Sequence, residues 1–553
     1  MELFPIRFVS TRGFVWPNVD LWRATVKRHS WKSASLATVM AACLSVVCLC
    51  KGAYGQETKG DQKPADDVKV RQERVESGFE PVELGKGQAP LKLSLAELMK
   101  AYKDPGLTVA VIDGYKIAWV KAYGTTELGG NTPVTPRTLF QAGSISKPVA
   151  ATGMLAMVQQ GKLSLDEDVN LKLKTWKVPE NEFTKEQKVT LRRLASHTAG
   201  LTVHGFPGYD VDEKVPSLVQ VLNGEKPPAN TPEIRVDFVP GTKWRYSGGG
   251  ITIEQLLMMD VSGKAFPALM KELVLEKAGM ADSSYEQPLP SAWQTRTATG
   301  TYRDGKSVHG KWHIYPEMAA AGLWTTPSDL AKFAIEIALE RQGKSSKLLS
   351  QKMIEEMFTR PPSSTNMGIG FALPADRPGE FGHDGADEGF QAQLIMNADT
   401  GQGVAIMANS DFGIAVANEY VRSLAKEYGW KNGMQARSTP DQMMLIGAMK
   451  GADAVLARYE ELDRPGEKKP EEFILNMMGY QMLSRGDTDG ALKLFLKNVQ
   501  AYPESSNVYD SLGEAYAAAG KKELAIENYE KSLKMDPKNK NAEERLKKLK
   551  EQK

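Results

Sequence analysis

A 34-residue period in the C-terminal part of the chain constrains the fold more than any other feature of the sequence. Similar residues recur at this spacing: Gly479 and Gly513, Met482 and Tyr516, Gly486 and Gly520, Ala491 and Ala525, Phe495 and Tyr529, Pro503 and Pro537. Small residues let two helices approach closely, and the proline starts the next unit. Residues 471–537 are therefore predicted to form two stacked helix pairs, which must bury their faces against neighbouring helices.

This order of glycine, alanine, aromatic residue and proline is the pattern of tetratricopeptide repeats. We expect a linker and one flanking helix, from Thr439 to Leu462, within residues 431–470, and a basic helical tail over residues 538–553. Two roles remain open for this region. It is either a structural cap on the rest of the protein or a groove that binds a peptide or a protein partner.

The N-terminus predicts export. An apolar run from Ala34 to Cys50 follows four basic residues, and small residues at positions 53 and 55 resemble a signal-peptidase site. Residues 1–55 are thus expected to direct the chain to the periplasm or the exterior. Alternatives are an uncleaved membrane anchor, a lipid-attached Cys43 after Met40, or a misassigned start.

Composition excludes several other classes of function. The 553-residue chain has a formal net charge of +2, which does not indicate a nucleic-acid partner. Its three cysteines, Cys43, Cys48 and Cys50, all lie in the apolar run, so no disulfide or thiolate metal site is expected beyond it. Residues 56–90 are charged and poor in aromatic residues, which indicates a linker.

Residues 91–430 are expected to form one α/β (α+β) domain. A helix at Leu95–Tyr102 and strands at Leu107–Ile112 and Tyr115–Ala122 begin it. Strands at Gly389–Asn397 and Gly403–Asn409 and a helix at Gly413–Tyr428 close it. The simplest fold is one antiparallel sheet built from both ends of this region, flanked by helices, with a helical subdomain inserted. The loop-rich residues 202–245 are expected to cover a site.

Ser144 and Lys147 form the first candidate for catalysis. Their spacing places both side chains on one face of a helix start, after Gly143, and a buried lysine amine can remove a serine proton. The free N–H groups there can also hold a developing oxyanion. The spacing alone is weak evidence, because it recurs at Ser423 and Lys426, where an ordinary amphipathic helix is expected.

Two further stretches carry polar groups beside small residues. Tyr246 precedes Ser247 and three glycines, and a phenol beside a cation can relay protons. His383 begins a stretch that continues Asp384-Gly385-Ala386. Small residues there let a substrate lie along a strand edge, where a backbone N–H completes an oxyanion hole. His383 is expected to bind a substrate carboxylate or to hydrogen-bond Tyr246.

Other histidines are not expected to act in catalysis. His309 and His313 are four residues apart, but Gly310 and Pro316 argue against a helix and no further ligands are evident, so we predict no metal. His197 is interpreted as structural, at a helix end. No Gly-x-Ser-x-Gly stretch occurs, so a Ser-His-Asp hydrolase lacks its usual signature.

Taken together, these stretches resemble the serine beta-lactamase-related family, which includes class C beta-lactamases, D-alanyl-D-alanine carboxypeptidases, D-aminopeptidases and esterases. The resemblance covers roughly residues 90–430. It rests on residues 143–147, 246–248 and 383–385 in that order, supported by residues 194–201 and 321–330. It implies the fold of a beta-lactamase or transpeptidase and a two-step acyl transfer to water without metal or cofactor.

By this resemblance, Ser144 is the nucleophile, Lys147 its base, and Tyr246 a proton relay. The backbone N–H groups of Ser144 and Ala386 would form the oxyanion hole, beside His383 and Gly385. The substrate would be an ester, an amide or a D-amino-acid peptide.

The sequence departs from the family pattern at two positions. Lactamases and carboxypeptidases of this family usually carry Asn where this chain has Gly248, and Lys where it has His383. The Asn holds the acylamino group of the substrate and the Lys anchors its carboxylate, so efficient beta-lactam hydrolysis is not expected. The alternative function is a catalytically idle sensor of cell-wall fragments, or a scaffold, that recruits partners through its repeats.

Overall fold

The computed structural model describes residues 65–85, 87–430, 436–464 and 470–551. The predicted signal or anchor segment and all three cysteines lie outside these ranges. None of the helices that the described residues form has the length and apolar character needed to cross a membrane.

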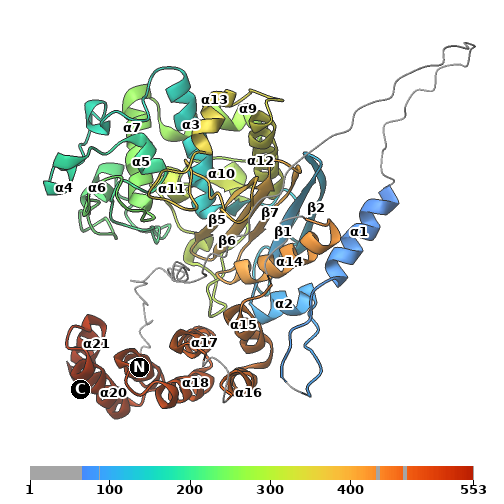
Figure 1. Ribbon diagram of the computed structural model, residues 1–553, viewed down its shortest axis with the longest axis vertical. Coiled ribbons are helices and arrows are strands. Elements are labelled where there is room, and N and C mark those ends of the chain that lie inside the picture. The colour runs from blue at the N-terminus through green and yellow to red at the C-terminus, as the bar shows by residue number, and fades with distance from the viewer. Residues whose placement is uncertain (1–64, 86, 431–435, 465–469, 552–553) are drawn as a thin grey trace, which may run out of the picture. The chain divides into compact units, whose positions relative to one another are not determined.

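The centre of residues 91–430 is a five-stranded antiparallel sheet in the order β2-β1-β7-β6-β5. Figure 1 shows the blue strands from the start of the region beside the brown strands from its end. The predicted sheet built from both ends of the region is therefore confirmed. The strands are β1 (Gly106–Asp113), β2 (Lys116–Gly124), β5 (Glu380–Asp387), β6 (Phe390–Asn397) and β7 (Gln402–Ala408).

Strand β5 was not among the predicted strands. It contains two glycines and no β-branched residue, so it lacks the composition typical of a strand. It forms because every residue from Glu380 to Asp387 pairs with β6. The His383-Asp384-Gly385 stretch therefore lies within the edge strand of the sheet rather than in a loop before it.

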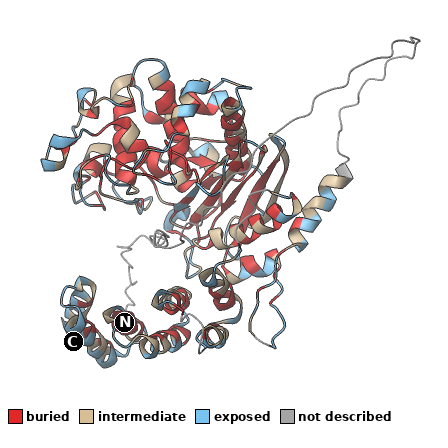
Figure 2. Ribbon diagram, viewed as in Figure 1, coloured by how far each residue is buried: buried red, intermediate tan, exposed pale blue. Residues whose placement is uncertain are grey.

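Helices cover both faces of this sheet, whose strands are largely buried (Figure 2). Ala110 and Ile112 of β1 share a hydrophobic cluster with Phe333 of α12 (Pro327–Arg341). Successive strand residues face opposite sides, so Val109 and Val111 face away from α12. Helix α14 (Gly413–Glu427) packs on β6 and β7, and also contacts α2.

The interpretation of residues 56–90 as a linker is wrong for its described part from residue 69 on. Helix α1 (Ala65–Ser77) leads into a segment in which Val75, Phe79 and Val82 are buried. Arg74 pairs with Glu427 of α14. These apolar residues are widely spaced among charged ones, so the composition of the segment concealed them. Helix α2 (Leu95–Ala101) follows, with Ser94 as its predicted N-cap.

Most of the inserted subdomain is helical, as predicted, and its helices share one large hydrophobic cluster. The helix after Tyr246 begins at Gly248, because the Ser247 side chain caps it by accepting from Gly250 N. The remaining elements are β3 (Phe140–Gln141), η1 (Gly143–Ile145), α3 (Ser146–Gln159), η2 (Val169–Leu171), α4 (Glu182–Glu186), α5 (Leu191–Ala195), α6 (Leu218–Asn223), α7 (Gly248–Ser262), α8 (Phe266–Met270), η3 (Lys271–Leu275), α9 (Glu276–Ala278), α10 (Ser291–Gln294), η4 (His309–Lys311), α11 (Met318–Ala321), β4 (Trp324–Thr325) and α13 (Gln351–Met357).

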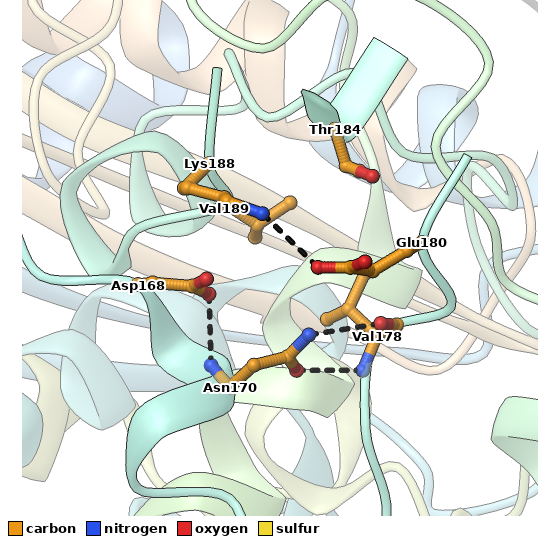
Figure 3. A pocket seen from close by; sticks show the side chains of 7 residues that line it. All are labelled: Asp168, Asn170, Val178, Glu180, Thr184, Lys188 and Val189. Atoms are coloured by element: carbon orange, nitrogen blue, oxygen red, sulfur yellow. Dashed lines mark hydrogen bonds and ion pairs between the residues drawn. The ribbon is translucent and has the colours of Figure 1, made fainter. Parts of the chain in front are cut away.

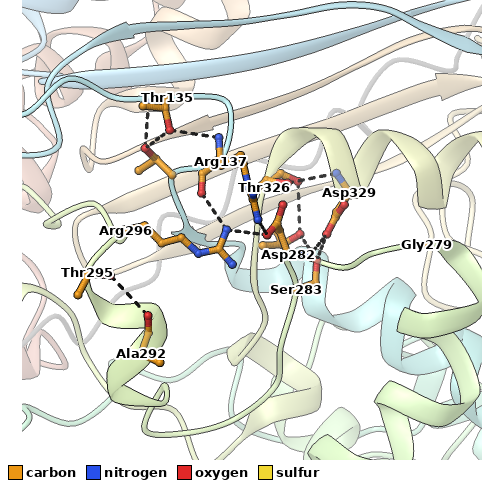
Figure 4. A network of polar contacts seen from close by, with 12 residues as sticks. Thr135, Arg137, Gly279, Asp282, Ser283, Ala292, Thr295, Arg296, Thr326 and Asp329 are labelled. Carbon is orange, nitrogen blue, oxygen red and sulfur yellow. Dashed lines mark hydrogen bonds and ion pairs between the residues drawn. The ribbon is translucent and has the colours of Figure 1, made fainter.

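A polar network anchors the start of α12 to this subdomain (Figure 4). The Asp329 carboxylate accepts from the backbone N–H of Asp282 at 2.7 Å and from the Ser283 hydroxyl at 2.9 Å. Asp282 in turn accepts from Arg137 at 2.9 Å and from Arg296 at 2.6 Å. The network thereby holds the segment around Asp282 against the start of α12.

The repeats form helices α17 (Glu472–Ser484), α18 (Thr488–Ala501), α19 (Ser506–Ala518) and α20 (Lys522–Met535), followed by α21 (Lys540–Glu551) in the predicted basic tail. The prediction of one flanking helix from Thr439 to Leu462 is wrong. The chain forms two helices, α15 (Thr439–Lys450) and α16 (Ala452–Leu462), separated at Gly451, whose φ of +80° ends the first. This pair contacts α17 and α18 and so covers the first repeat.

Candidate active site

Ser144 lies on a tight turn that leads directly into α3. Gly143 has a φ of +52°, which favours glycine, and begins the short helix η1. A Cβ atom at Gly143 would lie 2.4 Å from the backbone N of Ala386, so only glycine lets the turn approach strand β5 this closely. The predicted serine is thus held at the helix start, against the edge of the sheet.

Lys147 points at this serine. Its Nζ atom lies 2.8 Å from Ser144 Oγ and donates to the carbonyl oxygen of Ala320 at 2.7 Å. The residue is 2% exposed. Burial disfavours the ammonium form and lowers the pKa of Lys147 to about 7, against a smaller opposing effect of Asp387. At neutral pH a large fraction of this lysine is therefore an uncharged amine, as the predicted base requires.

Tyr246 reaches the same serine from the end of the long loop. The Ser144 side chain lies close enough to lower the pKa of Tyr246 slightly, and the Tyr246 ring centroid lies 5.0 Å from the Nζ atom of Lys147. Burial raises the pKa of Tyr246 above its usual value, so the phenol stays protonated at neutral pH. The structure therefore brings Tyr246 beside Ser144 and Lys147, which lie about 100 residues before it in the sequence.

Two histidine rings pack closely on Tyr246. The ring centroid of His197 lies 4.2 Å from that of Tyr246, and the centroid of His204 lies 4.8 Å away. The sequence was interpreted as giving His197 a structural place at a helix end. Its Nδ1 atom accepts from Ser247 N and its carbonyl oxygen accepts from Arg245 N, so its ring and its backbone both hold the segment that carries Tyr246. His204 was missed. The only sequence signal for it was its place in the loop-rich stretch.

His383 lies on β5 with its ring centroid 6.1 Å from that of Tyr246. Its Nδ1 atom donates to the carbonyl oxygen of Asp384 at 2.5 Å. Burial, together with the nearby Lys147, lowers the pKa of His383 to about 4. The neutral ring then keeps Nε2 as an acceptor, which cannot donate to a substrate carboxylate.

The backbone N–H of Ala386 faces the open edge of the sheet. Gly382 N donates to Ala372 O, and Ala372 N donates to Gly382 O, so Gly382 directs its polar groups away from β6. Polar groups alternate in direction along an antiparallel strand, and the pairing of β5 with β6 has no register shift. Ala386, four residues on, therefore presents its N–H to the same edge as Gly382, where Ser144 lies.

Gly385 allows this contact. A Cβ atom at Gly385 would lie 1.9 Å from the carbonyl oxygen of Ala142, so no larger residue fits without moving the backbone. Gly143 thus lies against Ala386, and Gly385 lies against Ala142, so the serine turn and strand β5 are in close contact. This contact is compatible with an oxyanion hole formed by the N–H groups of Ser144 and Ala386.

The buried carboxyl group of Asp387 was not predicted as part of the site. Burial raises its pKa well above the usual value, while Lys147 and the backbone N–H of Gly143 lower it. Its Oδ2 atom has no hydrogen-bond partner among the described residues. Asp387 therefore interacts with both the serine turn and the lysine. Its place directly after Ala386 was the signal that could have found it.

Two further histidines among the described residues each lie beside an aspartate. His309 lies 3.2 Å from Asp212, and His313 lies 2.9 Å from Asp210. Among the described residues no group of three potential ligands could hold a metal ion.

A small pocket elsewhere in the subdomain carries none of these residues (Figure 3). The Asn170 amide binds the backbone of Val178 through both its oxygen and its nitrogen, and Lys188 pairs with Glu180. These contacts hold a loop together, and we assign the pocket a structural role.

Comparison with known proteins agrees with this geometry. Residues 94–426 match the family model for beta-lactamase, and residues 506–539 match the model for the tetratricopeptide repeat. The beta-lactamase of Escherichia coli (strain K12) is 29% identical over 248 residues, which cover 43% of this chain and 58% of that protein. The unguisins hydrolase ungD' of Aspergillus campestris (strain IBT 28561) is 25% identical over 354 residues, covering 58% of this chain and 62% of that one.

Among solved structures, the octameric penicillin-binding protein homologue from Pyrococcus abyssi has a TM-score of 0.50 and 22% identity, over 61% of this chain and 76% of that one. This likeness supports the fold. The match to the beta-lactamase model spans more than half of the chain. The protein belongs to the beta-lactamase family of serine hydrolases and penicillin-binding-like proteins, and it carries a C-terminal tetratricopeptide repeat.

Proposed function

We propose that the protein hydrolyses esters or amides through an acyl-enzyme on Ser144. The observation that carries this proposal is the 2.8 Å contact between Ser144 Oγ and the buried Nζ atom of Lys147. A lysine held neutral by burial is a base strong enough to take the proton of an attacking serine.

In the acylation step, Ser144 Oγ attacks the substrate carbonyl while its proton passes to Lys147 Nζ. The carbonyl oxygen becomes an oxyanion and is held by the N–H groups of Ser144 and Ala386. When the bond to the leaving group breaks, the leaving group takes a proton from the Tyr246 hydroxyl. The phenol regains a proton from the Lys147 ammonium, so the lysine is neutral again.

Deacylation repeats these steps with water in place of serine. Water gives its proton to the pair of Tyr246 and Lys147 and attacks the acyl carbon, and Ser144 leaves with the returned proton. Because the pKa of Tyr246 is raised, the phenol acts as a neutral relay between Lys147 and the substrate. For Tyr246 to act as a phenolate base at neutral pH, its pKa would have to be lowered instead of raised.

The proposed substrate is uncharged beside the scissile bond. His383 occupies the place where a cation would hold a substrate carboxylate, and its lowered pKa keeps it neutral above about pH 4. Gly248 has no side chain to hold an acylamino group. We therefore expect turnover of simple esters or amides to exceed turnover of beta-lactams, although relatives of this chain are named beta-lactamases.

Covalent labelling tests the proposal. A fluorophosphonate probe should label the intact protein, and Ser144→Ala should abolish both labelling and hydrolysis of 4-nitrophenyl esters. Ser423→Ala is a matched control, because Ser423 has the same spacing to a lysine but donates to the carbonyl oxygen of Val75 at 2.5 Å. Labelling that persists in Ser144→Ala would show that another residue is the nucleophile.

Export and partner binding are further parts of the proposal. The apolar run from Ala34 to Cys50 supports export, and the repeat supports a protein partner in addition to a small substrate. Fractionation of cells that express the full chain tests the first, since accumulation inside the cytoplasm would contradict it.

A further inference from the structure

The segment Thr202–Phe206 runs along the residues that follow Tyr246. The Ser247 hydroxyl donates to Thr202 O at 2.7 Å. Gly248 N donates to His204 O at 2.9 Å, and Gly249 N donates to Val203 O at 3.1 Å. The start of α7 and this segment are thus held together over three successive residues.

The segment fills the space beside Gly248. A Cβ atom at Gly248 would lie 3.1 Å from His204 O and 3.1 Å from Cε2 of Phe206. A longer side chain at this position would have to displace the segment. The region next to the tyrosine is therefore shaped by the side chains of His204 and Phe206 instead of by residue 248.

The backbone of the segment is held in a costly conformation. Val203 has a φ of +62°, which is rare for a β-branched residue and unfavourable by roughly 1–3 kcal/mol. Its carbonyl oxygen accepts from Gly249 N and also from the Ser247 hydroxyl. These contacts keep the segment in a single conformation against α7, which is how surfaces that select a ligand are commonly held.

His204 presents a neutral ring at the rim of the site. One side of the ring packs on Tyr246, and the residue is otherwise exposed. Burial of that side and the nearby Lys147 both lower the pKa of His204, so the ring is uncharged at neutral pH. Phe206 is partly buried against the hydrophobic cluster of the subdomain.

We propose that His204 and Phe206 form the wall that contacts the acyl group of the substrate, and that this wall selects apolar acyl groups without an acylamino substituent. The ring of His204 packs on Tyr246, and a Cβ atom at Gly248 would lie 3.1 Å from the ring of Phe206, so both side chains lie beside the proposed proton relay. His383 contacts Tyr246 from a different element, strand β5. The inference rests on the proposed hydrolysis at Ser144.

The test uses two series of substrates with the full-length protein. In the first, 4-nitrophenyl esters from acetate to hexanoate vary the acyl chain. In the second, acetate esters of phenols with different substituents vary the leaving group. In the wild type, each added methylene should raise kcat/KM by up to about fourfold, because an apolar wall buries it. The ester of N-acetyl-D-alanine should react more slowly than the butyrate.

In Phe206→Ala and His204→Ala, kcat/KM should increase less with each added methylene of the acyl chain than in the wild type. The dependence of kcat/KM on the leaving group should stay the same. For Phe206→Ala, the rate with acetate should stay within a few-fold of the wild type. Phe183→Ala and His309→Ala are matched controls from other parts of the subdomain. Thermal unfolding would verify that each variant is folded.

The outcomes separate the two proposals. If both variants turn over the esters with the same dependence on acyl chain length as the wild type, His204 and Phe206 do not contact the acyl group, and the proposal is contradicted. If the two variants change the dependence on the leaving group as much as the dependence on the acyl chain, these residues lie on the leaving-group side of the scissile bond. This result would also contradict the proposal. A wild-type protein without turnover of any ester would overturn the proposed hydrolysis, and the wall with it.

Discussion

The Nζ atom of Lys147 lies 2.8 Å from Ser144 Oγ, and the same nitrogen donates to Ala320 O at 2.7 Å. A neutral amine satisfies both contacts, since it donates one proton to the carbonyl oxygen and accepts the serine proton with its lone pair. An ammonium group could only donate. The protonation state of Lys147 therefore decides whether Ser144 is activated.

Activity should consequently follow the titration of Lys147. Its pKa is lowered to about 7, so protonation at lower pH removes the base. We expect kcat/KM to rise about tenfold per pH unit below pH 7 and to level off above it. A pH profile measured with a neutral 4-nitrophenyl ester tests this. A profile that stays flat between pH 5 and pH 8 would contradict a lysine base.

Replacing Tyr246 by phenylalanine should slow turnover without unfolding the protein. The ring would keep its packing on His197 and His204, while the proton relay to the leaving group would be lost. Loss of a general acid typically costs about 10²- to 10⁴-fold in rate. The loss should be larger for alkyl esters than for 4-nitrophenyl esters, because 4-nitrophenolate leaves without a proton. Equal losses for both would argue against the relay.

A methyl group at Gly385 should disrupt the oxyanion hole. Its Cβ atom would lie 1.9 Å from Ala142 O, so the serine turn would have to move away from Ala386. Removal of one oxyanion donor costs roughly 10²- to 10³-fold in kcat, and Gly385→Ala should lose at least that much. Gly250→Ala is the control, since a Cβ atom there has no contact shorter than 3.4 Å. Steady-state kinetics of both variants would distinguish a local clash from a general intolerance of alanine.

The buried Glu254 of α7 should make stability depend on pH. Both its carboxyl oxygens lack hydrogen-bond partners among the described residues, and burial raises its pKa from 4.5 to about 8. Between these values the folded protein keeps a proton that the unfolded chain releases. The contribution of this group to stability is therefore complete below about pH 4.5 and is lost as the pH rises towards 8.

Glu254→Leu should remove this loss, so that the Tm of the variant rises relative to the wild type as the pH increases from 5 to 8. Each unit of pKa difference corresponds to about 1.4 kcal/mol. The exposed Glu186→Leu should show no such trend. Thermal unfolding at several pH values measures both, and a constant difference between Glu254→Leu and the wild type would show that Glu254 is not titrating.

The parts of the fold that the sequence predicted are those with a strong local pattern. The hairpin of β1 and β2 has a turn at Asp113-Gly114, and helix α2 has its cap at Ser94. Strand β5 has no such pattern and forms only because β6 supplies its partners. The sequence predicted a single helix from Thr439 to Leu462, because a glycine such as Gly451 can either lie within a helix or end it. Whether the helix continues through Gly451 depends on how the flanking segments pack.

The site shows the same division. Chain spacing placed Ser144 and Lys147 on one turn, and the resemblance to a family identified Tyr246, Gly385 and Ala386 as residues of a possible site. Neither His204 nor Asp387 was predicted, because the only signals for them were a place in a loop-rich stretch and a place directly after Ala386. Their roles follow from contacts with Tyr246 and with the serine turn, which join segments distant in the chain.

By itself, the sequence determined which chemical groups the protein carries, the order in which they occur, and that a 34-residue repeat folds as paired helices. Only the tertiary structure decided that the pKa of Lys147 falls to about 7, that His383 is neutral, and that His204 packs beside the relay. The reason is that local spacing fixes contacts within one helix or strand. Burial and electrostatic environment arise from segments that meet only when the whole chain has folded.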